Sequence, residues 1–293
     1  MANIVYPALF DTADNASLSS QKKLLRLTML HGGLLIVASL LTINVQPEKK
    51  YLISMAVIYF AVLGVSIYIG VKKFEKPWYN GRAIAESIKT NTWRYCMRAA
   101  PFDNYTNIQN SKSEFRDMLK RILNSNKSTL SKAINTAPDT DVNNQVTNEM
   151  NIIRSLSLNE RKNFYLKYRI KEQQAWYFKK SLENKKKQNV FFGIVITVQT
   201  IAFGLVLIRI GFPDWKYWPT DTLLLIASLM LAWMQMKKFN ELSSSYNLTA
   251  QEIGLIKEDI EDLNSEEEFS EFVNHAELAF SREHTQWAAR QGN

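Results

Sequence analysis

The sequence predicts an all-α membrane protein with four transmembrane helices in two hairpins and long cytoplasmic helices. Four long apolar stretches lie in an otherwise polar chain of 293 residues. A helix of about 20 apolar residues is long enough to cross the hydrocarbon core of a bilayer. Lysine and arginine flank these stretches, and one connection carries Trp215, Tyr217 and Trp218, residue types that favour the headgroup layer. Capping patterns mark polar helices between and after the apolar stretches.

The predicted spans are residues 27–45, 51–71, 190–208 and 219–236. The connection within each pair is short, so each pair returns the chain to the side of the membrane from which it came. Basic residues are more numerous at the two ends of the first pair than in its turn. By the positive-inside rule, both termini are then cytoplasmic.

The two pairs divide the chain into comparable units. We expect an N-terminal arm at residues 1–20, a first two-span unit at 21–123, a polar linker at 124–150 and a second two-span unit at 151–293. The linker is rich in Asn, Ser, Thr and Asp and contains Pro138, a composition typical of loops.

Three capping boxes predict helix starts in the second unit, at Ser157–Glu160, Thr249–Glu252 and Ser265–Glu268. No glycine or proline lies between the first box and the third span, so we expect one helix to run on into the membrane. Apolar residues after Thr249 repeat in a 3-4-3 pattern typical of a coiled-coil seam. The residues that we expect to carry assembly are apolar or aromatic: Trp176, Ile253, Ile256, Ile260, Phe272 and Trp287.

A few polar residues interrupt the predicted spans. Small residues follow one face of the third span, at Gly193, Thr197, Thr200 and Gly204. The first interpretation of this face is close helix packing, which small residues permit. The alternative is a narrow polar pore. The residues expected to line such a pore are Thr197, Gln199 and Thr200, with Thr28, His31 and Thr42 as second choices.

Charge is unevenly distributed along the chain. Residues 72–188 carry 24 positive and 11 negative charges, whereas residues 237–293 carry 5 positive and 12 negative charges. The basic middle either reflects retention of positive charge on the cytoplasmic side, with the acidic tail as an internal partner, or forms an anion-binding surface. For the second interpretation, the candidate contacts to a nucleotide are Arg82, Lys89, Arg94 and Arg98.

The sequence gives little indication of catalysis. It contains no glycine-rich phosphate loop, Cys/His metal set or nucleophile elbow. Ser281 and His284 are of nucleophile and base types, but they lie one turn apart on a regular helix with no evident oxyanion hole. The lone Cys96 cannot form an internal disulfide. We therefore expect neither an enzyme nor a cofactor, and no specific nucleic-acid partner.

Several segments resemble the SLATT families, which are two-transmembrane effector domains associated with bacterial nucleotide-second-messenger and SLOG-type sensor systems. In the first unit the similar segment is KPWYNGRAIAESIKTNTWRYCMRAAPF, from Lys76 to Phe102. In the second unit the similar segments are LNERKNFYLKYRIKEQQAWY, YNLTAQE and EEEFSEFVNHAELAFSREHTQWAAR. The last of these, from Glu266 to Arg290, is the most specific. Two such domains therefore look fused in tandem.

The resemblance implies a multi-pass effector of the bacterial inner membrane that acts in an antiphage or other conflict system. Such a protein would form homo-oligomers in the lipid bilayer and permeabilise it when a sensor protein or a nucleotide second messenger triggers it. A second interpretation is a non-conducting receptor or scaffold that recruits a partner through its cytoplasmic helices. If the protein is a scaffold, its activity should tolerate Thr197→Val and Thr200→Val. It should be lost on charge reversal at Arg161, Lys162 and Arg169.

Overall fold

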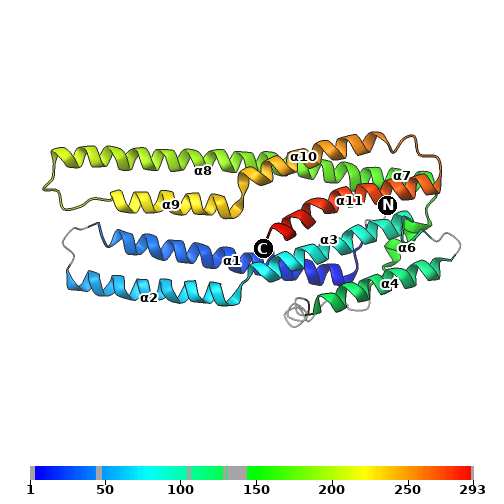
Figure 1. Ribbon diagram of the computed structural model, residues 1–293, viewed down its shortest axis with the longest axis horizontal. Coiled ribbons are helices and arrows are strands. Elements are labelled where there is room, and N and C mark those ends of the chain that lie inside the picture. Colours follow the sequence, from blue (N-terminus) through cyan, green and yellow to red (C-terminus); the bar gives the residue numbers. More distant parts are fainter. Residues whose placement is uncertain (1–3, 44–47, 104–106, 128–129, 131–143, 292–293) are drawn as a thin grey trace. The chain divides into compact units, whose positions relative to one another are not determined.

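The computed structural model describes residues 4–43, 48–103, 107–127, 130 and 144–291, with side chains described as far as Phe280 (Figure 1). Its regular structure is helical, which confirms the predicted all-α class. The elements are α1 (Ala8–Leu40), α2 (Lys49–Lys72), α3 (Glu75–Met97), α4 (Ile108–Ser125), α6 (Asn148–Ser155), α7 (Leu158–Tyr165), the π-helix η1 (Leu166–Lys171), α8 (Glu172–Gly211), α9 (Thr220–Lys237), α10 (Phe239–Glu258) and α11 (Glu266–Gln291).

The chain forms two compact units. The head unit comprises residues 1–22, 74–178 and 247–293, and the membrane unit comprises residues 23–73 and 179–246. This division does not follow the predicted order of units along the sequence, because each compact unit takes segments from both halves of the chain. Helices α1, α8 and α10 each contribute residues to both units.

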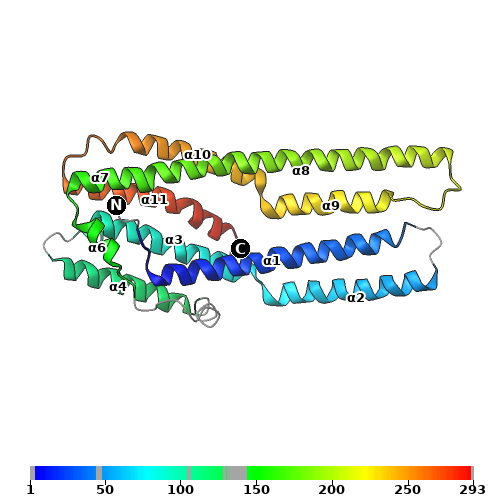
Figure 2. The same cartoon turned by 180° about the vertical axis from the view of Figure 1, so that it is seen from behind.

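Within the described residues, four helices are long and apolar enough to cross a membrane, and their apolar parts lie in α1, α2, α8 and α9. Figures 1 and 2 both show α9 beside α8 and beside α1, with α2 on the other side of α1. Val195 of α8 forms one buried cluster with Ala227 and Met234 of α9. On α1, Ser39 Oγ lies 2.8 Å from Thr222 Oγ1 of α9. Helix α9 therefore packs against a helix from each predicted pair.

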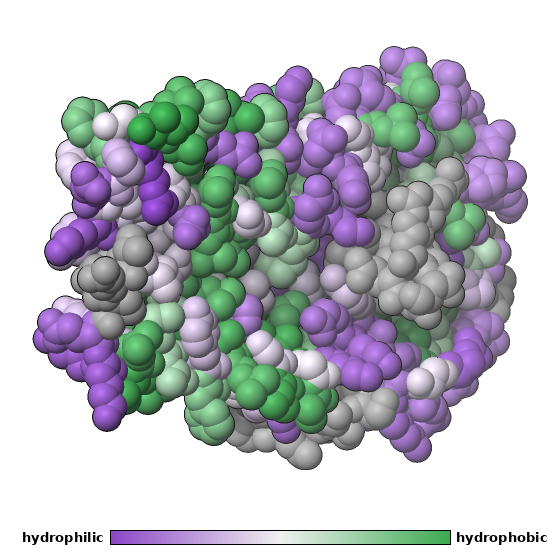
Figure 3. Space-filling view, turned by 60° about the vertical axis from the view of Figure 1, so that its left-hand side comes forward, coloured by the Kyte–Doolittle hydropathy of each residue, from purple (hydrophilic) through white to green (hydrophobic). Residues whose placement is uncertain are grey.

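Apolar side chains cover the outside of the membrane unit. Helix α2 has no buried residue, and its Phe60 and Val71 are 79% and 72% exposed. Figure 3 shows apolar residues gathered in a green band on one face, with hydrophilic residues at its edge. A surface of this kind is unfavourable in water and favourable in hydrocarbon. The chain is therefore a multi-pass membrane protein.

The first span is shorter than the sequence predicts. We expect it to reach residue 45, but α1 ends at Leu40. The backbone then turns, and Thr42 donates to the Ser39 carbonyl from its N–H at 3.1 Å and from its Oγ1 at 2.7 Å. A threonine hydroxyl that bonds a nearby carbonyl offers the backbone an alternative to the helix. Residues 44–47 lie outside the described chain.

The predicted N-terminal arm is wrong from Ala8 onward. Helix α1 begins there, and its Ala13 and Ser17 are 0% and 2% exposed. On α3, a Cβ added to Gly81 would lie 2.9 Å from both the Ala13 carbonyl oxygen and the Ser17 nitrogen. Only glycine fits at such a contact between helix backbones without movement. The small residues of α1 therefore serve helix packing rather than a free arm.

The predicted continuous helix from residue 158 through the third apolar stretch is confirmed, because helical structure runs from Leu158 to Gly211. Ser157 caps it, with the Ser157 N–H donating to Glu160 Oε2 at 2.9 Å and the Glu160 N–H donating to Ser157 Oγ at 3.4 Å. The predicted box at Ser265 is confirmed as well, since the Glu268 N–H donates to Ser265 Oγ at 3.1 Å.

The capping box predicted at Thr249 is wrong. Thr249 lies inside α10, which runs from Phe239 to Glu258. Its neighbours alanine, glutamine and glutamate are good helix formers, so the same letters suit a helix interior. The predicted coiled-coil seam is also interrupted, because α10 ends before Ile260, which is 2% exposed in the core of the head unit.

Aromatic residues fill the core of the head unit around α3. The ring of Tyr95 lies 5.0 Å from that of Phe115 and 6.0 Å from that of Phe102, measured between centroids. The ring of Trp93 lies 5.7 Å from that of Tyr165. Helix α3 also packs against α4, α6 and α11. These contacts place the C-terminal end of α3 at the centre of the network described next.

Candidate functional site: a buried arginine network

Three arginines between α6 and η1 are buried in the head unit. Arg154, Arg161 and Arg169 are 3%, 0% and 3% exposed. Arginine almost never loses contact with water unless its guanidinium is fully hydrogen-bonded or paired. The partners of these three side chains therefore show what holds the head unit together.

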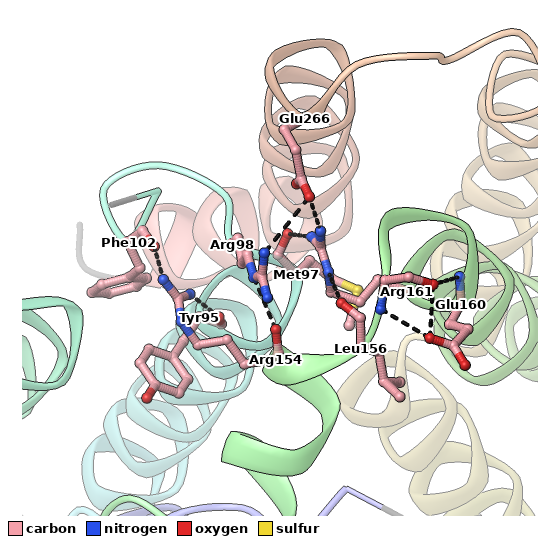
Figure 4. A network of polar contacts seen from close by, with 10 residues as sticks. Tyr95, Met97, Arg98, Phe102, Arg154, Leu156, Glu160, Arg161 and Glu266 are labelled. Carbon is pink, nitrogen blue, oxygen red and sulfur yellow. Dashed lines mark hydrogen bonds and ion pairs between the residues drawn. The ribbon is translucent and has the colours of Figure 1, made fainter. Parts of the chain in front are cut away.

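Arg154 donates hydrogen bonds to backbone carbonyl oxygens near the end of α3 and just beyond it (Figure 4). Its guanidinium donates to the Tyr95 carbonyl at 2.5 Å, to the Phe102 carbonyl at 2.7 Å and to Ser111 Oγ at 3.0 Å. The same guanidinium lies 4.9 Å from the centroid of the Tyr95 ring. Burial lowers the pKa of Arg154, although the guanidinium remains charged because its ordinary pKa is so high.

Arg161 approaches the same helix end from α7. It donates to the Met97 carbonyl at 2.8 Å and to the Leu156 carbonyl at 3.1 Å, and it forms an ion pair with Glu266 (Figure 4). Arg98 donates to the Arg154 carbonyl at 2.9 Å and lies 3.7 Å from Glu266. The last carbonyls of a helix carry a partial negative charge, which cations stabilise. The guanidinium groups of Arg154 and Arg161 therefore cap the C-terminus of α3.

Arg169 forms a two-point ion pair with Glu277 of α11. Its Nε lies 2.7 Å from Glu277 Oε1 and its Nη2 lies 2.6 Å from Oε2, while Tyr165 Oη donates to Oε1 at 3.0 Å. Glu277 is 0% exposed. Burial by itself lowers the pKa of Arg169, but the charge and hydrogen bonds of Glu277 outweigh this effect and raise it above its ordinary value. The guanidinium of Arg169 therefore stays charged.

Arg169 lies within η1, a π-helical segment of six residues. Such segments are rare and often mark functional sites. Because η1 precedes α8 without a break, the Arg169–Glu277 pair joins α11 to the helix that continues into the membrane unit. From the sequence, we expected Arg161 and Arg169 only as charges that a recruited partner would need, and so missed this buried network. Arg154 lies on α6 and Arg161 on α7, so their spacing of seven residues does not place them on one helical face.

The four residues predicted to contact a nucleotide do not form one cluster. Arg82 and Lys89 line a cavity of about 370 Å³. Arg94 lines a different hollow beside Ser270. Arg98 belongs to the arginine network. Within the described residues, no group of three or more His, Cys, Asp or Glu side chains could hold a metal ion.

The predicted pore residues fall on different helices of the membrane unit. Thr197, Gln199 and Thr200 are exposed on α8. Thr28 and His31 are partly buried on α1, and Thr42 is exposed after its end. The packing of α8 on α9 uses Val195 and its neighbours instead, so the small-residue face stays uncovered in the single chain.

Three of the six predicted assembly residues are buried inside the head unit. Ile253, Ile260 and Phe272 are 1%, 2% and 8% exposed, which leaves little of them for contact with a second copy. Trp176 is 38% exposed, and Ile256 is partly buried. Trp287 lies outside the described side chains, as do Ser281 and His284.

These observations define a class of protein, a multi-pass all-α membrane protein with a helical head unit. Residues 7–162 match the family model described as SMODS and SLOG-associating 2TM effector domain 3, and residues 165–287 match that of SMODS and SLOG-associating 2TM effector domain 1. The chain belongs to the family of SMODS and SLOG-associating two-transmembrane effector domains and carries two of them in tandem, which confirms the resemblance. No curated protein and no solved structure matches the chain.

Proposed function

We propose that this protein is a bacterial inner-membrane effector of an antiphage or other conflict system, which oligomerises and permeabilises the membrane when a partner or nucleotide signal triggers it. The tandem effector domains and the four apolar helices support this function. The proposed target is the membrane itself, so the protein acts without catalysis.

The observation that carries the proposal is the environment of Gln199. This residue is exposed near the middle of the span 190–208, and its amide forms no hydrogen bond with the described part of the chain. Leaving such an amide unpaired in hydrocarbon costs roughly 2–7 kcal/mol. Thr197 and Thr200 avoid this cost, because their hydroxyls donate to carbonyls of α8 at 2.9 and 2.8 Å. A second copy of the chain, or water in a pore, would supply the partners that Gln199 lacks.

The proposed topology has two membrane hairpins, with the head unit and both termini in the cytoplasm. The connection between α8 and α9 supports an interfacial position for this turn. Trp218 Nε1 donates to the Trp215 carbonyl at 2.7 Å, and the Arg209 guanidinium lies 5.3 Å from the Trp218 ring. Aromatic rings and snorkelling cations of this kind favour the headgroup layer.

Labelling of introduced cysteines tests this topology. In a Cys96→Ala background, we expect Lys49→Cys, at the start of α2, and Asp214→Cys, in the turn between α8 and α9, to react with an impermeant maleimide added to intact spheroplasts, because both positions are exposed at the expected outer side. Glu114→Cys, exposed on α4, should react only after permeabilisation. Labelling of Glu114→Cys in intact spheroplasts would contradict the topology. The wild-type chain is the unlabelled control, because burial raises the pKa of the Cys96 thiol and keeps it unreactive.

Membrane permeabilisation is tested by expressing the chain in a bacterium under activating conditions and following the membrane potential with a voltage-sensitive dye. We expect depolarisation and growth arrest. Gln199→Leu should abolish most of the depolarisation while the protein still inserts, since leucine suits a lipid-facing position. The matched control is Gln251→Leu, the same change at an exposed position of α10, which should depolarise like the wild type.

Absence of both depolarisation and growth arrest with the wild-type chain would overturn the permeabilising function and favour the scaffold. Charge reversal at Arg161 or Arg169 does not discriminate between the two classes, because both side chains are buried and either change would disrupt the fold. The discriminating variants are therefore those on the exposed face of α8.

A further inference from the structure

The cavity lined by Arg82 and Lys89 lies within the head unit, among residues of α1, α3 and the η1–α8 helix. Its volume of about 370 Å³ is that of a small organic ligand rather than of a few waters. Arg169 lines one wall, so the cavity borders the π-helical segment and the ion pair to α11.

Among the described residues, one cation that lines this cavity has no hydrogen-bond or ion-pair partner. Arg82 lies 2.9 Å from Glu86 and 3.8 Å from Asp14, and Arg169 is bound to Glu277. Lys89 forms no hydrogen bond or ion pair with the described residues. A largely desolvated ammonium without a partner is unfavourable. Two effects lower the pKa of Lys89: the larger is burial, and the smaller is repulsion between its ammonium and the Arg169 guanidinium.

Carboxylates limit how much negative charge a ligand could bring. Asp14, Glu86 and Glu172 also line the cavity, and Glu172 is exposed. They would repel a polyphosphate, whereas the single unpaired ammonium of Lys89 matches one negative charge. The expected ligand is therefore a monoanion.

Aromatic rings form much of the remaining wall. The rings of Tyr6, which precedes α1, and Phe10, which lies in α1, have their centroids 4.6 Å apart, and Tyr168 and Trp176 line the cavity from the η1–α8 helix. Trp176 is 38% exposed, which leaves part of its ring surface accessible. A planar ring stacked on aromatic side chains gains about 1–3 kcal/mol.

We propose that this cavity binds a planar ligand with a single negative charge, which stacks on Trp176 or Tyr168 and places its acidic group at Lys89. A cyclic mononucleotide, with one phosphodiester charge, and an aromatic carboxylate both have this chemistry. The inference rests on the proposed function for its regulatory meaning: such a ligand would be the trigger, and it would act beside Arg169 on the helix that continues into the membrane unit.

Isothermal titration calorimetry on the full-length protein in detergent tests the proposal. We expect binding of 3′,5′-cyclic AMP or cyclic GMP, or of indole-3-acetate, and these probes distinguish the two sources of the charge. Adenosine, which lacks the charge, should bind at least about tenfold more weakly, because one ion pair of 1.4 kcal/mol corresponds to that factor. ATP should not bind more tightly than cyclic AMP, because the cavity carboxylates repel its extra charge.

Variants identify the site. Lys89→Met should weaken binding about tenfold or more and leave the melting temperature unchanged or raised, because it removes an unpaired desolvated charge. Lys120→Met is the matched control, at an exposed lysine of α4, and should bind normally. Trp176→Leu, at a partly exposed position, should also weaken binding. This variant tests the site if Lys89→Met does not fold.

Unchanged affinity in Lys89→Met, equal affinity for adenosine and cyclic AMP, or no heat from any probe at millimolar concentration would overturn the proposal. Binding in detergent does not depend on ion conduction. If the chain binds these probes but never depolarises cells, the binding site stands and the permeabilising function is wrong. If it depolarises cells but binds none of the probes, the permeabilising function stands and the binding site is wrong.

Discussion

Glu277→Leu is expected to lower the free energy of unfolding of the head unit by about 3–5 kcal/mol, because it leaves the Arg169 guanidinium buried without a counter-ion. Arg169 is 3% exposed and donates to both carboxylate oxygens of Glu277, at 2.7 and 2.6 Å. The hydroxyl of Tyr165 loses its acceptor in the same variant. Unfolding by urea, followed by tryptophan fluorescence of the protein in detergent, measures the effect.

Two further variants separate the lost ion pair from the lost side chain. Arg169→Met combined with Glu277→Leu removes both charges, so it should recover much of the stability that the single change loses. Glu271→Leu makes the same substitution at an exposed position six residues earlier on α11, where a change within about 0.5 kcal/mol is expected. A loss below about 1 kcal/mol for Glu277→Leu would show that the pair does not hold α11 to η1.

Arg154→Met is the second change with a large expected effect, a loss of about 3 kcal/mol or more, since each orphaned buried acceptor costs about 1–3 kcal/mol. The methionine fills much of the volume but leaves the Tyr95 and Phe102 carbonyls without the donors that Arg154 supplies. It also removes the guanidinium from the Tyr95 ring, 4.9 Å away. The same denaturation experiment measures the loss.

Arg116→Met on α4 is the matched control for this change, because Arg116 is exposed and belongs to the same unit. Arg154→Lys should recover only part of the loss, since a single ammonium cannot span two carbonyls as a planar guanidinium does. Equal stability of Arg154→Met and Arg116→Met would mean that the carbonyls at the end of α3 find other partners.

Much of the fold follows from local sequence. The apolar runs identify the four candidate membrane helices because about 20 consecutive uncharged, apolar residues match the thickness of the hydrocarbon core. The continuous helix from Leu158 to Gly211 follows from a capping box and the absence of glycine or proline before Gly193. The acidic tail was expected to offer partners to the basic middle, and Glu266 and Glu277 do pair with Arg161 and Arg169.

Local sequence misleads where a residue's role depends on a distant segment. Residues 8–20 look like an arm because they are small and polar, but Gly81 lets α3 approach their backbone. Ile253, Ile260 and Phe272 look like an assembly surface, but the head unit buries them. The nucleotide candidates share a basic stretch, yet only Arg82 and Lys89 reach the same cavity.

The sequence by itself determined that this protein is helical, that it has four membrane spans and that it belongs to its effector family, because hydrophobic length, capping and motif are properties of contiguous residues. Tertiary structure alone decided which charges are neutralised. Arg161 and Arg169 are indistinguishable from Lys89 in a list of basic residues. The two arginines pair with buried or partly buried carboxylates, whereas Lys89 has no such partner among the described residues and lines an aromatic cavity.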